Sequence, residues 1–179
     1  TTIAGSSESG YGSREKGLLF VFLSAKGGTG TSSLCANLAM TIKEQHPEAR
    51  VVVVDLVLPI GSIGQIVGYG GQVNLVTAAN LPSGQANGEY FLKNLPEPEL
   101  WKFQLLAGSP DPQHGSDLKV DRIGQIVETL RSAYDFVILD IGRSLSRFSL
   151  PLIQQADLIE QWFGRFASIA PAVIRQLQG

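Results

Sequence analysis

The stretch 18–33, LLFVFLSAKGGTGTSS, determines which fold the rest of the chain can take. It begins with an apolar run over residues 18–23, breaks into GGTG at residues 27–30, and continues into a second apolar-rich segment from Ser32. The first run is short, contains β-branched and aromatic residues and ends at glycines, which favours a buried parallel strand. The stretch therefore predicts a strand, a glycine-rich loop and a helix in direct succession.

A loop of this kind predicts a binding site for an anion. Glycines allow the backbone to approach a ligand closely and to turn its N–H groups inward. The helix that follows adds the positive end of its dipole at the same point. The polyphosphate of a nucleotide fits this arrangement best. The alternative interpretation is a glycine-rich turn without a ligand, but the flanking strand and helix favour the phosphate site.

The residues of the loop resemble those of a known family. The common phosphate-loop pattern is G-x-x-x-x-G-K-[ST], and this chain has Ala25 at the first glycine and Thr31 at the lysine. KGGTGTS instead resembles the deviant Walker A loop of the ParA/MinD superfamily, K-G-G-x-G-K-[ST]. The resemblance implies that Lys26 contacts phosphate across a nucleotide-sandwich dimer and that Ser32 binds magnesium. Thr31 in place of the second lysine resembles the CpaE/TadZ branch, the pilus-assembly and polar-localisation relatives.

A second apolar run ends in a carboxylate. Residues 50–58, RVVVVDLVL, predict a strand buried on both faces, with Asp55 at its carboxyl edge. Ligands bind at that edge of an open parallel sheet, and a carboxylate opposite Ser32 can hold magnesium directly or through water. The alternative is an aspartate that caps a helix or a turn. In the family pattern, D-x-D-P or D-x-D-x-x-x-G-D, Val57 replaces the second acid and Ser62 a later one, which argues against strong hydrolysis.

A third apolar run also ends in an acid. Residues 134–144, YDFVILDIGRS, predict another buried strand, with Asp140 at its end. The segment resembles the Walker B segment of the superfamily, YD-h-h-h-h-D, whose acid orients the magnesium shell. Three strand-to-loop junctions then carry the required chemistry in the required order. Two arginines follow Asp140 in the sequence. We expect Arg143 and Arg147 to face a phosphate, a partner or only solvent.

Periodicity elsewhere predicts further elements of an α/β fold. The first helix is expected at 32–45, with an apolar face of Leu34, Leu38 and Ile42. Residues 59–98 contain many glycines and are expected to be the least regular region. The other expected elements are a short helix at 74–80, a strand at 101–107, helices at 120–134 and 150–156, a strand from Asp157 and a helix at 167–178. The strand from Asp157 becomes unusually polar, which indicates an altered sheet edge, a local rearrangement or an irregular chain end.

Composition limits the classes of protein to which the chain can belong. With 179 residues, of which 44% are hydrophobic, the sequence predicts one globular domain with a substantial core. A formal net charge of -2 and the lack of a basic stripe give no electrostatic case for DNA binding. Because Cys35 is the single cysteine, the chain cannot form a disulfide scaffold. It also lacks the paired cysteine ligands that an interfacial iron–sulfur cluster needs. We expect Cys35 to be a buried structural thiol.

No apolar run approaches the roughly 20 residues of a membrane span, and the sequence has no secretion signal at its start. These features lead us to expect a cytoplasmic protein, recruited to the cell pole or the inner face of the membrane. Residues 1–17 are rich in Ser, Gly, Thr and charge and are expected to be a flexible linker or tail. Residues 18–179 are expected to form a ParA/MinD-like phosphate-loop domain without its C-terminal part, and the resemblance implies a preceding receiver domain.

Together these features predict an α/β fold of the phosphate-loop class, with a mostly parallel central sheet and helices on both faces in three Rossmann-like layers. The resemblance implies binding of ATP with Mg²⁺, nucleotide-dependent homodimerisation, and spatial organisation of a pilus, secretion or other polar machine through protein partners, with weak hydrolysis. Two alternatives stay open: an active ParA/MinD-type ATPase and a nucleotide-free scaffold. The resemblance assigns phosphate binding to Lys26, Gly27, Gly28, Thr29, Gly30, Thr31, Ser32 and Ser33, catalysis to Lys26 and Asp55, and magnesium to Ser32, Asp55 and Asp140.

Overall fold

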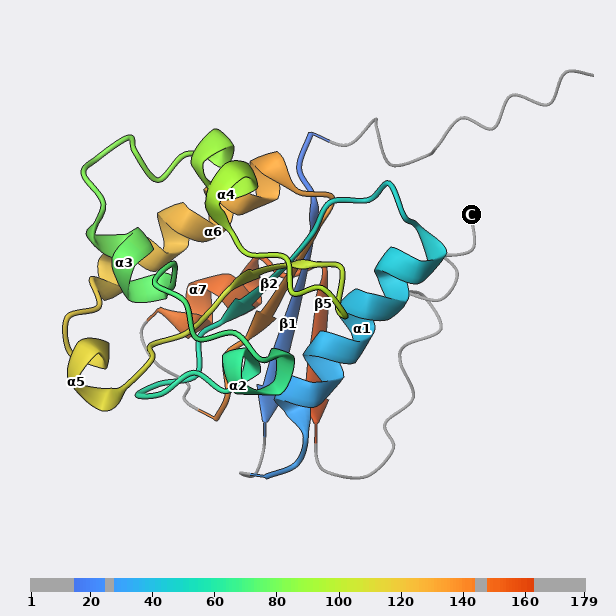
Figure 1. Cartoon of the computed structure of the whole chain (residues 1–179), viewed down its shortest axis with the longest axis horizontal. Coiled ribbons are helices and arrows are strands. Elements are labelled where there is room, and N and C mark those ends of the chain that lie inside the picture. Colours follow the sequence, from blue (N-terminus) through green and yellow to red (C-terminus); the bar gives the residue numbers. More distant parts are fainter. Residues whose placement is uncertain (1–14, 25–27, 144–147, 163–179) are drawn as a thin grey trace, which may run out of the picture.

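The structure is a computed structural model that describes residues 15–24, 28–143 and 148–162. Within these residues, five strands form one sheet in the order β3-β2-β4-β1-β5, and every neighbouring pair is parallel. The strands are β1 (Leu18–Ser24), β2 (Val51–Asp55), β3 (Gln104–Leu106), β4 (Phe136–Asp140) and β5 (Leu158–Trp162). The parallel central sheet that the sequence predicts is therefore confirmed (Figure 1).

The strands form because their residues are apolar toward both faces of the sheet. In β4, Val137 and Leu139 pack on one face, whereas Phe136 and Ile138 pack on the other. All five residues of β2 and all five of β4 are buried, including the aspartate at the end of each strand. This burial on both faces explains the unbroken apolar runs of the sequence, as expected for a parallel sheet covered by helices.

Helices cover both faces of this sheet (Figure 1). One face is covered by α1 (Thr31–Gln45) and α2 (Ile63–Val67). The other face is covered by α3 (Leu75–Asn80), α4 (Gly88–Asn94), α6 (Ile123–Ala133) and α7 (Ser149–Gln154). The short helix α5 (Pro112–Gly115) and the 3₁₀ turn η1 (Val120–Arg122) lie in the connection between β3 and α6. The molecule thus has the predicted three layers.

The helix α1 begins one residue before the predicted range and ends where predicted. Its buried face differs from the predicted one: of Leu34, Leu38 and Ile42, only Ile42 is fully buried. The other two pack at the margin of the core, and its centre is formed by Cys35 and two alanines. Small side chains let the helix lie close to the strands, and α1 contacts β1, β2 and β4. The prediction of a buried structural thiol is confirmed.

Several predicted elements are present with shorter bounds. The strand predicted at 101–107 is wrong in its first half, because β3 begins only at Gln104. Lys102 has a φ of 57°, a left-handed conformation that interrupts an extended chain. The helices predicted at 120–134 and 150–156 are confirmed as α6 and α7, each shorter than predicted. The short helix predicted at 74–80 is confirmed as α3.

Residues 59–98 contain more regular structure than the sequence predicts. The helices α2 and α4 have only five and seven residues, so neither shows a clear periodicity. The side chain of Asn87 caps the start of α4, and the buried Phe91 joins α4 to the core beside α6. Gly88 permits this close approach, since a Cβ there would lie 3.1 Å from the Cβ of Ala133. These helices depend on tertiary packing more than on local sequence.

The strand β5, predicted from Asp157 onward, pairs in parallel with β1 and is an edge strand among the strands described. This position explains its polar residues, because an edge strand is covered on fewer sides than a central one. Ile159 is accordingly 48% exposed. The helix predicted at 167–178 and residues 1–14 of the predicted linker lie outside the described residues.

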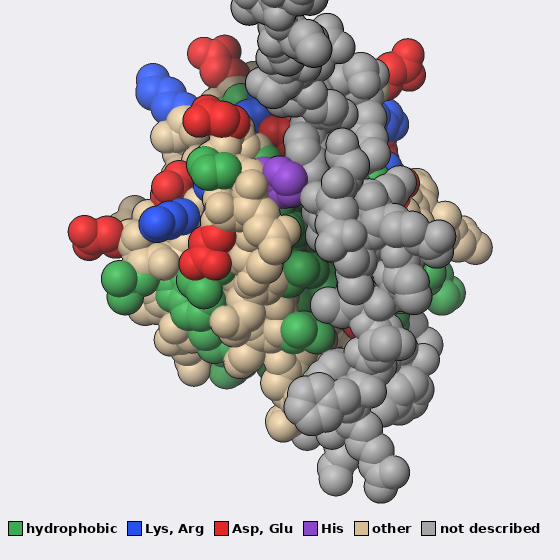
Figure 2. All heavy atoms as spheres, turned by 90° about the vertical axis from the view of Figure 1, so that its right-hand side faces the viewer, with side chains coloured by type: hydrophobic (Ala, Val, Ile, Leu, Met, Phe, Trp, Pro, Cys, Tyr) green, Lys and Arg blue, Asp and Glu red, His purple; other side chains and the backbone are tan. Residues whose placement is uncertain are grey.

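The surface beside α1 carries charges of both signs. Figure 2 shows the side of the molecule that lies at the right of Figure 1. On its visible, described part, acidic and basic side chains are interspersed without forming a basic stripe. No helix within the described ranges is long and apolar enough to cross a membrane.

Candidate functional site

The candidate site lies at the carboxyl ends of β1, β4 and β2, which are neighbours in the sheet. Because β4 runs between the other two, Asp140 is aligned with Phe22 of β1 on one side and with Asp55 of β2 on the other. The glycine loop follows β1, and α1 follows the loop. In open parallel sheets, ligands bind at this edge. The topology therefore brings the three predicted junctions together.

Two glycines shape the described half of the loop. Gly28 and Gly30 have φ angles of 73° and 84°, in the left-handed region that favours glycine. A Cβ added at either position would meet no atom of the described residues within 4 Å. The glycines are therefore required by the backbone conformation and not by packing, and the loop faces open space. Lys26 and Gly27 lie outside the described residues, so the contacts predicted for them stay predictions.

The N-terminus of α1 presents backbone donors to the same space. The helix begins directly after Gly30, and no side chain in the described part of the chain caps it. The N–H of Leu34 donates to the carbonyl of Gly30 at 2.9 Å, so the N–H groups of residues 31–33 precede the first bond within the helix. Together with the positive end of the helix dipole, these groups can bind an anion.

Thr31, at the position of the missing lysine, is turned toward the loop itself. It is only 5% exposed, and its Oγ1 lies 3.1 Å from Oγ1 of Thr29. Oγ1 of Thr29 lies in turn 2.9 Å from Oγ of Ser24, the last residue of β1. The three hydroxyls therefore connect the two ends of the loop. A neutral, internally bonded hydroxyl thus replaces the ammonium group that most phosphate loops carry here.

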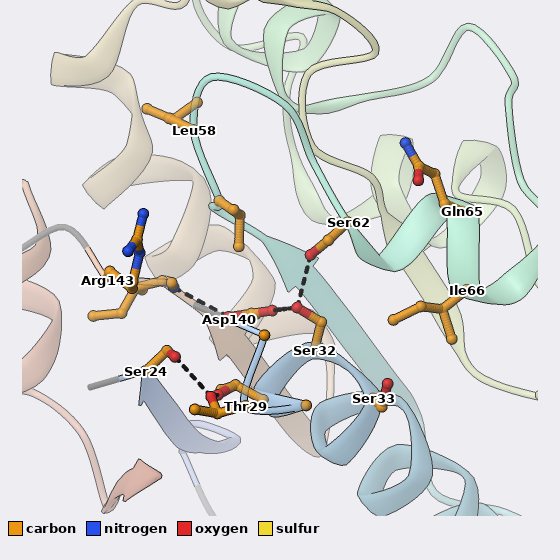
Figure 3. Close-up of a pocket in the computed structure, with 16 residues that line it drawn as sticks. Ser24, Thr29, Ser32, Ser33, Leu58, Ser62, Gln65, Ile66, Asp140 and Arg143 are labelled. Carbon is orange, nitrogen blue, oxygen red and sulfur yellow. Dashed lines mark hydrogen bonds between the residues drawn. The ribbon is translucent and has the colours of Figure 1, made fainter. Parts of the chain in front are cut away.

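Ser32 and Asp140 lie in direct contact. Oγ of Ser32 donates to Oδ2 of Asp140 at 2.5 Å and lies 2.7 Å from Oγ of Ser62 (Figure 3). These three residues come from α1, from β4 and from the residue before α2. The structure thus brings together two of the three residues predicted to bind magnesium and adds the hydroxyl of Ser62 to them.

Asp140 is held in place from both sides of its carboxylate. Besides the bond from Ser32, its Oδ1 accepts the N–H of Gly142 at 3.1 Å. Burial raises the pKa of Asp140 above its ordinary value, while the hydrogen bonds from Ser32 and Gly142 act in the opposite direction. A cation bound at this carboxylate would favour the charged form and offset the effect of burial.

Asp55 has a different set of partners, all of them backbone groups. Its Oδ2 accepts the N–H of Ser62 at 2.6 Å and the N–H of Ile63 at 2.8 Å. Its Oδ1 accepts the N–H of Val57 at 3.1 Å. The carboxylate therefore holds the connection between β2 and α2, which is the arrangement that the turn-aspartate interpretation predicts. The structure places Asp55 beside Asp140 but not in contact with Ser32.

The surroundings of Asp55 are closely packed. A Cβ at Gly61 would lie 2.8 Å from Oδ2 of Asp55 and 2.7 Å from the Cα of Gly108, so only glycine fits there. Burial raises the pKa of Asp55 to about 7; the N–H of Ile63 opposes this shift, and the charge of Asp140 adds to it. Asp55 is not among the residues that line the cavity over the site.

This cavity has a volume of about 960 Å³ and opens above the carboxyl edge of the sheet. Ligand pockets commonly measure about 300–1,000 Å³, so the volume suits a nucleotide. Among the described residues that line the cavity, Arg143 is the single lysine or arginine. The lining consists of Ser24, Gly28, Thr29, Gly30, Thr31, Ser32, Ser33, Val57, Leu58, Ser62, Gln65, Ile66, Asp140, Ile141, Gly142 and Arg143.

The oxygens at this edge fit a magnesium ion that is bound together with phosphates. Magnesium takes oxygen ligands, keeps several waters, and usually needs only one or two carboxylates besides the substrate. Ser32 and Asp140 offer a hydroxyl and a carboxylate side by side, and Ser62 adds a second hydroxyl. The described residues contain no group of three or more His, Cys, Asp or Glu that could hold a metal alone, and a magnesium–nucleotide site does not need one.

Sequence reasoning did not assign Ser24 and Ser62 to the site. In the sequence, Ser62 is only a departure from the acidic pattern of the family. Its position seven residues after Asp55, where that pattern has an acid, is the signal that points to the site. Ser24 gives no such signal, because a serine at the end of a strand is common and its partner Thr29 is set by the fold of the loop.

No protein-family model matches this chain, and no curated protein matches it in sequence. Solved structures do match it. The ParA family ATPase from Chlorobium tepidum TLS superposes with a TM-score of 0.68 at 22% identity over 83% of this chain and 60% of that one. The septum site-determining protein MinD from Pyrococcus horikoshii, complexed with Mg-ADP, superposes with a TM-score of 0.62 at 18% identity, over 81% of this chain and 57% of that one. Cobyrinic acid a,c-diamide synthase from Mycobacterium smegmatis, with a bound ATP analogue and magnesium, superposes with a TM-score of 0.59 at 18% identity, over 90% of this chain and 64% of that one.

The chain has a ParA/MinD-like P-loop ATPase fold. At these identities the likeness concerns the fold, and this chain spans only about 57–64% of the three proteins named. Two of the three hold a nucleotide together with magnesium. Within this fold, the three junctions that the sequence singled out are the glycine loop after β1, Asp55 at the end of β2 and Asp140 at the end of β4.

Proposed function

We propose that this chain binds ATP together with Mg²⁺ at the carboxyl edge of its sheet. The observation that carries the proposal is the meeting of two features in one cavity. The glycine loop and the uncapped start of α1 provide backbone donors for phosphates. The Ser32–Asp140 pair provides oxygens for the cation that accompanies them. The ParA/MinD-like fold supports the proposal, since related structures hold Mg-ADP or an ATP analogue with magnesium.

The roles of individual residues follow from this proposal. The N–H groups from Gly27 to Ser33 bind the phosphates, and Lys26 contacts phosphate across a dimer of two such chains. Ser32 and Asp140 bind magnesium, which would neutralise the charge of the phosphates once bound. Asp55 acts on the same shell through water or through the loop that it holds.

We propose that hydrolysis is weak. Thr31 removes one charge-neutralising contact to the β- and γ-phosphates, which phosphate-loop enzymes obtain from lysine. Val57 removes an acid that would position the attacking water. The neutral hydroxyl of Ser62, which contacts Ser32, replaces a further acid of the family pattern. The protein is thus proposed to use the nucleotide for conformation and assembly more than for turnover.

The proposed cellular role is positional, as in the CpaE/TadZ branch. Nucleotide-dependent dimerisation would organise a pilus-assembly, secretion or other polar machine from the cytoplasm, through protein partners at the pole or the inner face of the membrane. The likeness to MinD and ParA structures supports a role of this type. The mixed charges on the described part of the surface beside α1 do not favour DNA as a partner.

The first test is a calorimetric titration of the protein with Mg-ATP and with Mg-ADP, alongside a Lys26→Ala variant. Binding that is weakened in the variant is expected. Steady-state ATP turnover at the level of an active ParA or MinD would favour the full ATPase instead. The absence of heat with either nucleotide, on protein shown to be folded by circular dichroism, would contradict the proposal and favour a nucleotide-free scaffold.

A further inference from the structure

The cavity has an unusual balance of charge for a nucleotide site. The phosphates of ATP carry several negative charges, and phosphate loops normally neutralise part of them with the lysine that precedes the Ser or Thr. Here Thr31 occupies that position, and its hydroxyl is bonded within the loop. We propose that Arg143 binds the phosphate chain and supplies the positive charge that Thr31 does not. This inference rests on the proposed binding of a nucleotide.

The backbone before Arg143 is fixed beside the glycine loop. The N–H of Gly142 donates to Oδ1 of Asp140 at 3.1 Å, and the carbonyl of Gly142 accepts the N–H of Ser24 at 2.9 Å. Gly142 has a φ of 61°, and a Cβ there would lie 3.3 Å from Cγ2 of Val57. This tight turn joins the end of β4 to the residue from which the loop departs. Arg143 is therefore anchored at the entrance of the phosphate site.

The side chain of Arg143 is available to a ligand. It is exposed, and among the described residues it makes no ion pair and no hydrogen bond. In contrast, Arg50 pairs with Asp135 at 3.4 Å and Arg131 pairs with Asp157 at 3.0 Å. Figure 3 shows Arg143 and Gln65 on opposite sides of the cavity. The guanidinium group of Arg143 extends along its own side of the cavity, toward Leu58.

The chemistry of this group suits phosphate. A guanidinium group donates two parallel hydrogen bonds to phosphate oxygens and keeps its charge at any physiological pH. Arg143 would reach the phosphates from the side of β4, whereas the N–H groups of α1 reach them from the other wall. Because its contribution depends on phosphate charge, Arg143 should favour ATP and ADP over AMP.

The test compares Mg-ATP affinity, measured by calorimetry, in the unchanged protein and in Arg143→Ala, Arg143→Lys and Arg50→Ala variants. Loss of a charge-assisted contact should weaken binding about tenfold in Arg143→Ala. Arg143→Lys should lie between the two, because lysine keeps the charge but loses the paired donors. Arg50 precedes β2 at the opposite edge of the sheet, so Arg50→Ala is the matched control and should bind as the unchanged protein does.

A double variant distinguishes a phosphate contact from a structural effect. If Arg143 replaces the missing lysine, Arg143→Ala should weaken binding much less in a Thr31→Lys background than in the unchanged chain. An Arg143→Ala variant that binds Mg-ATP normally, while Lys26→Ala binds it poorly, would overturn the assignment of Arg143 and leave the nucleotide site intact. If the unchanged protein is folded and binds no nucleotide, that result would overturn both the proposed function and this inference.

Discussion

Asp55 and Asp140 occupy equivalent places in the sheet, but their carboxylates have different hydrogen-bond partners. Each ends a fully buried strand, and the two are aligned across β2 and β4. The carboxylate of Asp140 contacts the hydroxyl of Ser32 and lines the cavity. The carboxylate of Asp55 accepts three backbone N–H groups of the connection that follows its own strand. The same residue type at the same edge therefore faces the proposed ligand site in one case and holds a loop in the other.

The connection after each strand explains the difference. After β4, the chain turns at Gly142 and leaves one carboxylate oxygen facing Ser32. After β2, the chain folds back over Asp55, with Gly61 packed against Oδ2. Ser62 connects the two environments, since its N–H donates to Asp55 and its hydroxyl lies against Ser32. A change at Asp55 should therefore affect stability first, and a change at Asp140 should affect ligand binding first.

The largest effect is expected for Asp55→Ala. The substitution leaves three backbone N–H groups without an acceptor, that of Ile63 buried and those of Val57 and Ser62 partly buried, and each unsatisfied buried donor costs about 1–3 kcal/mol. We expect the free energy of unfolding to fall by about 3–5 kcal/mol, measured by urea denaturation. Asp121→Ala, at an exposed position in η1, is the control and should change it by less than about 0.5 kcal/mol. Equal stability of both variants would contradict a structural role for Asp55.

The pH dependence of stability sharpens the same comparison. Asp55 has a pKa of about 7 in the folded protein, above the ordinary value of 3.8, so the folded state binds its proton more tightly than the unfolded state. The free energy of unfolding should therefore fall as pH rises from about 4 to about 7, and level off above that. With 1.36 kcal/mol per pKa unit, a pKa that rises from 3.8 to about 7 should give a decrease of about 4 kcal/mol.

Asp55→Asn isolates this contribution, since the amide cannot ionise. The neighbouring acid Asp140, whose pKa is also raised by burial, contributes in the same direction and is present in both proteins. The stability difference between the two proteins, measured in EDTA at a series of pH values, should thus vary mainly below pH 7. A difference that does not vary with pH would show that the pKa of Asp55 is the same in the folded and the unfolded protein, which would contradict the effect of burial.

Asp140→Asn should act on the ligand. Asparagine keeps one oxygen, which can accept from Ser32 or from Gly142 but not from both, and it removes the negative charge that a cation needs. We expect Mg-ATP affinity to fall about 10- to 100-fold, as for residues that hold a metal or orient its ligands. Titration with ATP in EDTA provides the control, because the variant should lose little affinity there. A loss of equal size with and without magnesium would assign Asp140 to the loop instead of the cation.

Local sequence predicted the parts of this comparison that depend on strand burial. The apolar runs before Asp55 and Asp140 favour buried strands, and the prediction that both acids lie at one edge of a parallel sheet is confirmed. The position of the loop after β1 could be predicted as well, because its glycines lie between an unbroken apolar run and a segment with helical spacing. The predicted strand ends at Asp55 and Asp140 and the start of α1 are within one residue of those observed.

The direction in which each carboxylate points could not be predicted. It depends on α2, a helix of five residues without a periodic signal, and on the contact between Gly61 and Gly108 from two distant connections. The left-handed Lys102 that delays the start of β3 likewise has no signature in the sequence. These features are fixed by packing between segments, whereas a single sequence reports mainly what each segment does alone.

The smallest effect is expected for Thr31→Lys, which acts on the ligand side of the comparison. The ammonium group restores a contact to the β- and γ-phosphates, so ATP turnover should rise by about three- to tenfold. The substitution also removes the hydroxyl bond to Thr29, which should lower the free energy of unfolding by about 1 kcal/mol. Thr31→Ala loses the same bond without gaining charge, so a rise confined to Thr31→Lys identifies the charge as its cause. Unchanged turnover in Thr31→Lys would mean that the missing lysine does not limit hydrolysis, and the departures at Val57 and Ser62 would then be the next to test.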